Sequence, residues 1–339
     1  MKILIDAFGG DNAPEEIVKG TVDAVNEEKD FTAVLVGKED RIKELLSGYK
    51  YDEKRIEILP ASDVITCEEE PTMAIRKKPD SSICVAFKEL KENPEVKGLV
   101  SAGSTGAVLV GATLKLGRIK GVNRPCLCPT LPTLVDGKNV LMLDVGANAD
   151  CKAINLCQFA LMGSVYAKIM GVENPKVALL SNGTEDEKGN ALNHEVFPIL
   201  KGMENINFVG NTEARDILSG DFDVIVTDGF SGNVALKSIE GAIGSMMKLL
   251  KREMLSTFKG KLGGMLLKDT FKGVMKKMDY NNGGALFLGA DKIVLKSHGS
   301  SKAHAIKCTV LQAVDYAKKG LIETLKQEIS SVDLSVGTV

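Results

Sequence analysis

The sequence contains no tryptophan, and only 5% of its 339 residues are aromatic. Proteins that bind single-stranded nucleic acid stack its bases on aromatic side chains, so this scarcity argues against such a surface. Basic residues are not in excess either, because 43 Lys and Arg are balanced by 45 Asp and Glu to give a net charge of -2. A nucleic-acid partner is therefore not expected.

A long apolar segment is also missing. No uninterrupted apolar run approaches the roughly 20 residues that a transmembrane helix needs. The start of the chain, from Met1 to Asp6, has neither the extended apolar stretch nor the cleavage site of a signal peptide. We therefore expect a cytoplasmic protein.

The cysteines and histidines do not form a recognisable metal or disulfide pattern. The seven cysteines include no CxxC pair, and the closest two, Cys126 and Cys128, are separated by one residue. Only three histidines are present to complete a metal set. We expect reduced cysteines that act as small buried side chains, and we predict neither a metal nor another cofactor.

Several catalytic signatures are absent as well. No glycine loop is followed by the Lys-Ser/Thr of a Walker A motif, and none has the GxGxxG spacing of a dinucleotide site. The GxSxG turn of serine hydrolases does not occur. A covalent acyl-enzyme on serine or cysteine is therefore not indicated.

Short apolar segments alternate with longer helical patterns along most of the chain. The expected strands are residues 2–6, 32–36, 56–59, 98–101, 140–144, 177–181, 206–209, 224–227 and 293–297. The expected helices include residues 15–26, 40–46, 81–92, 156–170 and 194–201. This alternation predicts a three-layer α/β/α fold around one doubly wound, mostly parallel sheet, in a single domain over residues 1–339.

Six of these strands are followed by turns that are rich in glycine and small polar residues. The turns are residues 9–12, 102–106, 145–148, 182–189, 228–233 and 298–301. One such turn is weak evidence, because glycine and serine are common in turns for conformational reasons. In open α/β sheets, however, ligands bind beyond the carboxyl ends of the strands. Six polar turns at one edge of a sheet therefore predict an anion-binding cleft.

Seven segments, most of them at these turns, follow one another in a fixed order. They are DAFGGDNAP, SAGSTGA, GRIKGVNRPCLCPTLPT, DVGANAD, NGTEDEKGN, TDGFSGN and SHGSS. This set resembles the motifs of the PlsX family of bacterial phosphate acyltransferases, from Met1 to about Lys326. The resemblance implies a fold similar to the isocitrate/isopropylmalate dehydrogenase and phosphotransacetylase group, and a homodimer.

The resemblance also implies a reaction, in which a long-chain acyl group passes from acyl carrier protein to inorganic phosphate. The acyl phosphate would supply a membrane glycerol-3-phosphate acyltransferase at the start of phospholipid synthesis. The protein would associate peripherally with the inner face of the membrane. An alternative within the same fold is a phosphotransacetylase-like enzyme that takes its acyl group from acyl-CoA.

The motifs carry specific expectations for residues. Lys188 and Asn233 match family positions that are implicated in catalysis, and His298, in a loop just after a strand, is a third catalytic candidate. The expected phosphate- and substrate-binding residues are Asp6, Gly9, Gly10, Asp11, Gly103, Ser104, Thr105, Gly106, Asn148, Asp228, Gly299 and Ser300.

Residues 233–278 interrupt the strand–helix alternation. Their pattern predicts a projecting hairpin of two amphipathic helices, with breaks near Gly260 and at 263–264. Nine basic residues lie between Lys248 and Lys277, against only two acidic ones. This composition fits an anionic membrane surface, and equally an acidic carrier protein or a dimer helix. The predicted contact residues are Leu262, Met265, Leu266, Leu267 and Phe271.

Overall fold

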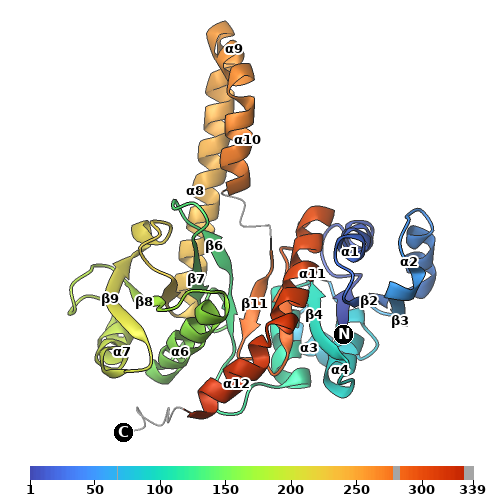
Figure 1. Ribbon diagram of the computed structural model, residues 1–339, viewed down its shortest axis with the longest axis horizontal. Helices are drawn as coiled ribbons and strands as arrows, with labels where there is room; N and C mark the ends of the chain where they lie inside the picture. Colours follow the sequence, from blue (N-terminus) through green and yellow to red (C-terminus); the bar gives the residue numbers. More distant parts are fainter. Residues whose placement is uncertain (67, 278–282, 332–339) are drawn as a thin grey trace.

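The strands form two mostly parallel sheets, where the sequence predicts one. A computed structural model describes residues 1–66, 68–277 and 283–331 of the chain (Figure 1). The larger sheet contains, in spatial order, β3 (Ile56–Pro60), β2 (Thr32–Gly37), β1 (Lys2–Asp6), β4 (Val96–Ser101), β12 (Ile293–Lys296), β11 (Ala285–Leu288) and β5 (Cys126–Cys128). The smaller sheet contains β6 (Thr130–Pro132), β7 (Asn139–Leu143), β10 (Val224–Val226), β8 (Lys176–Ser181) and β9 (Asn207–Glu213).

All nine strands predicted from the sequence are present. Wherever two of these nine strands are neighbours in a sheet, they pair in parallel. Three short strands were not predicted: β5, β6 and β11, each of which pairs antiparallel. β5 and β6 are separated only by Pro129, so one extended segment crosses from the larger sheet to the smaller one. This segment joins the two sheets at their adjacent edges.

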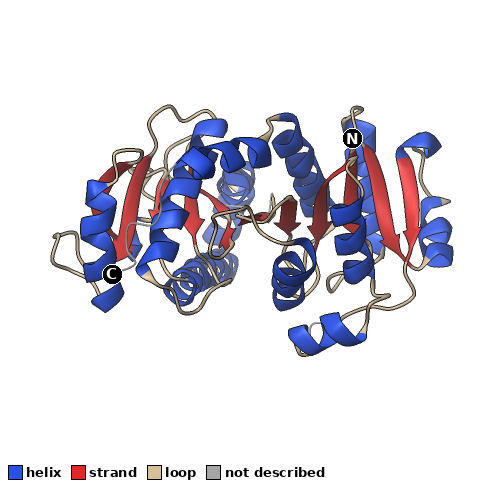
Figure 2. Ribbon diagram, turned by 90° about the horizontal axis from the view of Figure 1, so that it is seen from below, coloured by secondary structure: helices blue, strands red, loops and turns tan. Residues whose placement is uncertain are grey.

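Helices cover both faces of the sheets, which confirms the predicted α/β/α class (Figure 2). One buried cluster includes α1 (Glu15–Glu27), α2 (Glu39–Leu46), α6 (Ala153–Ile169), α7 (Ala191–Gly202), α11 (Ala303–Lys318) and α12 (Leu321–Ser331). A second cluster includes α3 (Pro71–Lys77), α4 (Ser82–Glu92), α5 (Thr105–Gly111) and the base of α8 (Gly229–Ser256). Strands buried on both faces explain why their sequences are apolar without alternation.

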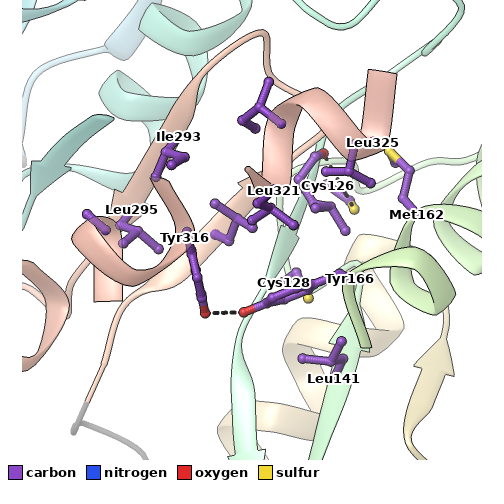
Figure 3. Close-up of a cluster of buried hydrophobic side chains, with 14 of the residues drawn as sticks. Cys126, Cys128, Leu141, Met162, Tyr166, Ile293, Leu295, Tyr316, Leu321 and Leu325 are labelled. Atoms are coloured by element: carbon purple, nitrogen blue, oxygen red, sulfur yellow. Dashed lines mark hydrogen bonds between the residues drawn. The ribbon is translucent and has the colours of Figure 1, made fainter. Parts of the chain in front are cut away.

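The hydrophobic core is continuous from one sheet to the other. Side chains of α6 pack against α12, and Met162 of α6 and Leu325 of α12 belong to the same buried cluster (Figure 3). The hydroxyls of Tyr166 and Tyr316 are hydrogen-bonded, and the two rings meet edge to face with centroids 5.4 Å apart. This shared core fixes the carboxyl ends of the two sets of strands relative to each other.

The predicted helical hairpin projects from the layered body (Figure 1). The 28-residue helix α8 begins at Gly229, four residues before the predicted start, because the Asp228 side chain accepts a hydrogen bond from Ser231 N at 2.8 Å. The chain then turns back through α9 (Phe258–Leu266) and α10 (Lys268–Lys277).

The break expected near Gly260 lies three residues earlier, and the break expected at 263–264 is wrong, because these two glycines lie inside α9. The chain breaks at Thr257, whose hydroxyl accepts from Gly260 N at 3.0 Å and caps α9, and again at Leu267. Met278 of the predicted hairpin and residues 332–339 of the predicted domain lie outside the described residues. Among the residues that the structure describes, no helix combines the length and apolarity needed to cross a membrane.

Candidate active site

Three of the predicted turns are fastened together at the carboxyl edge of the larger sheet. The backbone N–H of Asp11, after β1, donates to the carbonyl of Gly299, after β12, at 2.8 Å. The Asn12 side chain donates to the Ser300 carbonyl at 3.0 Å. The N–H of Ser297 donates to the Ser101 carbonyl, at the end of β4, at 2.9 Å. The turns after β1, β4 and β12 therefore form one unit.

Asp6, the last residue of β1, is connected to the turn after β4 by hydrogen bonds. Its Oδ2 accepts a hydrogen bond from Ser101 Oγ at 2.7 Å, and Ser101 Oγ accepts one from Gly103 N at 3.0 Å. Burial raises the pKa of the Asp6 carboxyl, while hydrogen bonds from Ser82 and Ser101 and the charge of Lys296 lower it less. Asp6 is buried, so its role in this structure is to hold the turns rather than to face solvent.

Glycine is required where the first two turns touch. A β-carbon at Gly9 would stand 2.5 Å from Asp6 Oδ2 and 2.7 Å from Gly103 N, closer than real contacts allow. Gly10 has a φ of 105°, which residues with a side chain rarely adopt. The close approach of these backbones explains the glycines in the first motif.

A second unit forms at the carboxyl edge of the smaller sheet. The Asp144 carboxylate, directly after β7, accepts hydrogen bonds from the backbone N–H groups of Leu127 at 2.9 Å, Ala147 at 3.1 Å and Asn148 at 2.7 Å. Burial raises the pKa of Asp144, and these hydrogen bonds oppose that rise. The Asn148 side chain donates to Asp144 and to the Pro125 carbonyl. Asn148 and Asp144 thus fasten this turn beside the start of α8.

A cavity of about 410 Å³ lies where the two units meet. Its lining brings together four of the predicted residues: Thr105, Gly106, Asn233 and His298. Further lining residues include Val145, Gly146, Lys237, Glu240, Lys296 and Ser297. Because these come from the turns after β4, β7 and β12 and from α8, only the packing of the two sheets creates the cavity.

Two lysines in this cavity were missed by the sequence reasoning. Lys237 lies four residues after Asn233 on α8 and forms an ion pair with Glu240 at 2.7 Å. Lys296, the last residue of β12, is only 8% exposed, and its Nζ donates to the carbonyls of Ala102, at 3.4 Å, and Ser297. Lys296 could have been noticed in the sequence, because a charged residue at the end of an otherwise apolar strand is unusual.

The two lysines affect His298. Loss of hydration at the cavity wall lowers the pKa of His298 most, and the positive charges of Lys237 and Lys296 lower it further. Glu240 and Asp11 act in the opposite direction but do not outweigh these effects. His298 is therefore neutral near pH 7, and it sits in a positive field.

Lys188 does not line this cavity. It is exposed in the loop after β8, and its side chain covers Gly183, where a β-carbon would stand 2.7 Å from Lys188 Cγ. The neighbouring Gly189 and Asn190 line a second cavity of about 810 Å³. Within one chain, Asn233 therefore lines the first cavity, whereas Lys188 lines neither and only its neighbours reach the second.

The second cavity is walled mainly by apolar side chains. Those from β8 and from the first turns of α8 are Leu179, Leu180, Phe230, Val234, Ala235 and Ile239. Asp228 also lines it, where that side chain caps α8. Phe230 is 66% exposed at the start of the helix. The two cavities thus flank the same first turns of α8.

The remaining predicted residues hold the turns in place. Ser104 caps α5 by accepting from Ala107 N at 3.4 Å. The hydroxyl of Ser300 lies 2.8 Å from His298 Nδ1. Gly103 and Gly299 lie in the fastened turns described above.

Comparison with known proteins gives a consistent match over the whole chain. The model of a family described as fatty acid synthesis protein matches residues 1–324. A phosphate acyltransferase of Clostridium tetani is 47% identical over 337 residues, which cover 98% of this chain and 99% of that protein. One of Bacillus cereus is 46% identical over 336 residues, 98% of this chain and 100% of that protein.

The fold is also found in solved structures. A phosphotransacetylase from Streptococcus pyogenes superposes with a TM-score of 0.59 over 97% of this chain and 94% of that one, at 17% identity. The EutD phosphotransacetylase from Staphylococcus aureus gives a TM-score of 0.55 over the same shares, at 15% identity. At these identities the likeness shows the fold alone.

Proposed function

The chain belongs to the fatty acid synthesis protein family and is an acyltransferase like its phosphate acyltransferase relatives, and from this we propose that it transfers a long-chain acyl group from acyl carrier protein to inorganic phosphate. The product is an acyl phosphate. The observation that carries the proposal is the cavity between the two sheets, where Thr105, Gly106, Asn233 and His298 meet beside two lysines. Positive charge and hydrogen-bond donors are the groups that recognise phosphate.

The chemistry requires little from the protein besides placement. Phosphate near pH 7 is largely a dianion and already nucleophilic, so a strong general base is unnecessary. A phosphate oxygen attacks the thioester carbon, the new C–O bond forms and the C–S bond breaks, and the thiolate leaves. Bound in the cavity, the phosphate is positioned by Thr105, Gly106 and His298, while the turn at Gly9 and Gly10 holds the neighbouring turns in place.

Asn233 and Lys188 have separate tasks in this proposal. The Asn233 amide donates to the carbonyl oxygen as negative charge develops there. Lys188, in the exposed loop after β8, is assigned to the departing thiolate because it matches the family motif. The position of Asn233 in the first cavity supports its assignment, and Gly189 and Asn190, beside Lys188, line the second cavity.

The apolar second cavity supports a fatty acyl donor. A volume of about 810 Å³ with mainly apolar walls falls in the range of sites that bury flexible apolar ligands. The cavity lies beside the same helix start as Asn233, so an acyl chain held there would leave its thioester near the phosphate. A short acyl group, as in a phosphotransacetylase, would leave most of this volume unused.

The hairpin supports contact with a membrane. At its tip, large apolar side chains are exposed, with Leu266 at 76%, and lysines such as Lys259, Lys261 and Lys268 are exposed among them. Apolar side chains that enter the headgroup region beside cations are typical of peripheral binding to anionic bilayers. Delivery of acyl phosphate to a membrane glycerol-3-phosphate acyltransferase would use this contact, and a homodimer belongs to the same proposal.

The proposal is tested by incubating the full chain with palmitoyl-carrier protein and labelled inorganic phosphate. We expect an acid-labile, labelled acyl phosphate together with free carrier thiol. Palmitoyl-CoA is assayed in parallel, because preferred use of the CoA thioester would favour the phosphotransacetylase-like alternative. Absence of acyl phosphate with both donors would contradict the proposed function.

A further inference from the structure

We propose that Lys296 is the side chain that neutralises the phosphate dianion in the cavity between the two sheets. This assignment deepens the proposed function and rests on it. Lys296 lines the cavity together with Thr105, Gly106 and His298, which come from the turns expected to hold the anion. No sequence motif marked it, because the last segment that carries the family resemblance begins directly after it, at Ser297.

The Lys296 ammonium is held in place before any ligand arrives. Its Nζ donates to the carbonyls of Ala102 and Ser297, the residues that directly follow β4 and β12. These two strands are neighbours in the larger sheet and pair in parallel, so the two acceptors are fixed where the strands end. A preorganised cation of this kind binds an anion with little loss of side-chain entropy.

The field at the cavity wall is positive. Four charged groups influence His298: Lys237 and Lys296 favour its neutral form, whereas Glu240 and Asp11 favour the protonated form. Because the effects of the two lysines on His298 exceed those of the two acidic groups, the charges around the cavity wall favour an anion there. Asp6 is hydrogen-bonded to Ser101 and does not line the cavity, and the charge of Lys296 lowers the pKa of its carboxyl against the effect of burial.

Lys237 is less suited to the same task. Its Nζ is already paired with Glu240 at 2.7 Å, and its side chain is about half exposed. An exposed, paired cation contributes little to binding because water and its partner screen it. Lys296 is buried, so water screens its charge less than it screens the charge of Lys237.

The kinetic test uses Lys296→Met, with Lys292→Met as its matched control. Lys292 immediately precedes the same strand at its other end, where its Nζ donates to the Val96 carbonyl at 3.5 Å, and it does not line the cavity. We expect Lys296→Met to raise the KM for phosphate about 10- to 100-fold, as for the loss of one charge-assisted hydrogen bond. The KM for the acyl donor should stay within about twofold, and Lys292→Met should change neither.

A binding test without acyl donor keeps the inference separate from turnover. The chain has only three histidines, so the His298 imidazole resonance can be assigned by comparison with His298→Gln. Titration of the wild type with inorganic phosphate should shift this resonance and raise the pKa of His298, since a bound dianion stabilises the imidazolium. Lys292→Met should respond as the wild type does, and Lys296→Met should respond only at much higher phosphate.

The outcomes separate the two proposals. If wild-type enzyme binds phosphate at His298 but forms no acyl phosphate, the proposed reaction fails. If Lys296→Met binds phosphate as tightly as the wild type, the Lys296 assignment fails while the reaction stands. Should Lys296→Met not fold, as judged by circular dichroism, Lys296→Arg keeps the charge and is expected to retain the phosphate-dependent shift; loss of that shift in folded Lys296→Arg would overturn the assignment.

Discussion

The Nδ1 atom of His298 accepts a hydrogen bond from the backbone N–H of Ser300 at 3.3 Å. The Ser300 hydroxyl also lies 2.8 Å from Nδ1, and both groups donate to Nδ1 when the single proton of the neutral imidazole is on Nε2. His298, whose pKa lies below its usual value, is therefore a neutral side chain with Nε2–H available as a donor. The HGSS turn thus sets the tautomer of the histidine that lines the cavity.

This relationship predicts a difference between two amide substitutions. In His298→Gln the amide nitrogen reaches the position of Nε2, whereas in His298→Asn it stops near Nδ1, where it would oppose the Ser300 N–H. We expect kcat/KM for phosphate to fall less than about tenfold in the Gln variant and about 100-fold in the Asn variant, as for loss of a preorganised donor. Equal rates in the two variants would show that Nε2 does not donate.

The lowered pKa of His298 predicts a pH effect on stability. Below its usual pKa of 6.5 the unfolded chain binds the proton more readily than the folded one, so the contribution of His298 is fully present above pH 6.5 and is lost as the pH falls through the folded pKa. Urea unfolding of wild type and His298→Gln between pH 5 and 7.5 measures this. The wild type should lose stability relative to the variant on acidification, and a constant difference would contradict the shift.

Substitution of the two proposed catalytic residues gives the next prediction. Asn233→Ala should lower kcat about 10²- to 10³-fold with little change in the KM for phosphate, because the amide acts on the developing oxyanion. Lys188→Ala should also lower kcat, whereas Lys29→Ala, at an exposed lysine in the connection between α1 and β2, should not. Near-normal kcat in Asn233→Ala or Lys188→Ala would remove that residue from the mechanism.

The tight contact at Gly9 predicts a loss of stability. In Gly9→Ala the new methyl group would stand 2.5 Å from Asp6 Oδ2, so the turns must separate, at a cost of about 1–3 kcal/mol. Gly202→Ala, at the end of α7, meets no atom within 4 Å and should be neutral or stabilising by up to about 1 kcal/mol. Urea unfolding measures the stability of both variants. A similar stability for the two would show that Gly9 is not in tight contact with Asp6.

Negative charges introduced at the tip of the hairpin test whether the hairpin contacts a membrane. Leu266→Glu with Leu267→Glu should abolish binding to anionic vesicles in a sedimentation assay and leave turnover of palmitoyl-carrier protein in solution unchanged. Leu134→Glu, at a leucine that is 75% exposed but outside the hairpin, should bind vesicles as the wild type does. Retained vesicle binding with lost dimerisation, or with a raised KM for the carrier protein, would instead assign the tip to a partner.

The parallel strands could be predicted from the sequence because burial on both faces makes them continuously apolar. The polar turns could be predicted because glycine and small polar residues follow such strands directly. β5, β6 and β11 could not, since they have three or four residues each and exist only through partners elsewhere, as in the pairing of Leu286 with Cys128. Short segments without periodicity contain no local signal for such pairing.

The sequence by itself determined the α/β class, the turns that hold polar groups, and the reaction family through the order of its motifs. Tertiary structure alone decided that the strands divide into two sheets, that Asn233 and His298 share a cavity from which Lys188 is absent, and that Lys296 is buried beside them. The reason is physical: periodicity and composition report each segment's own burial and conformation, whereas a cavity depends on how distant segments pack against one another.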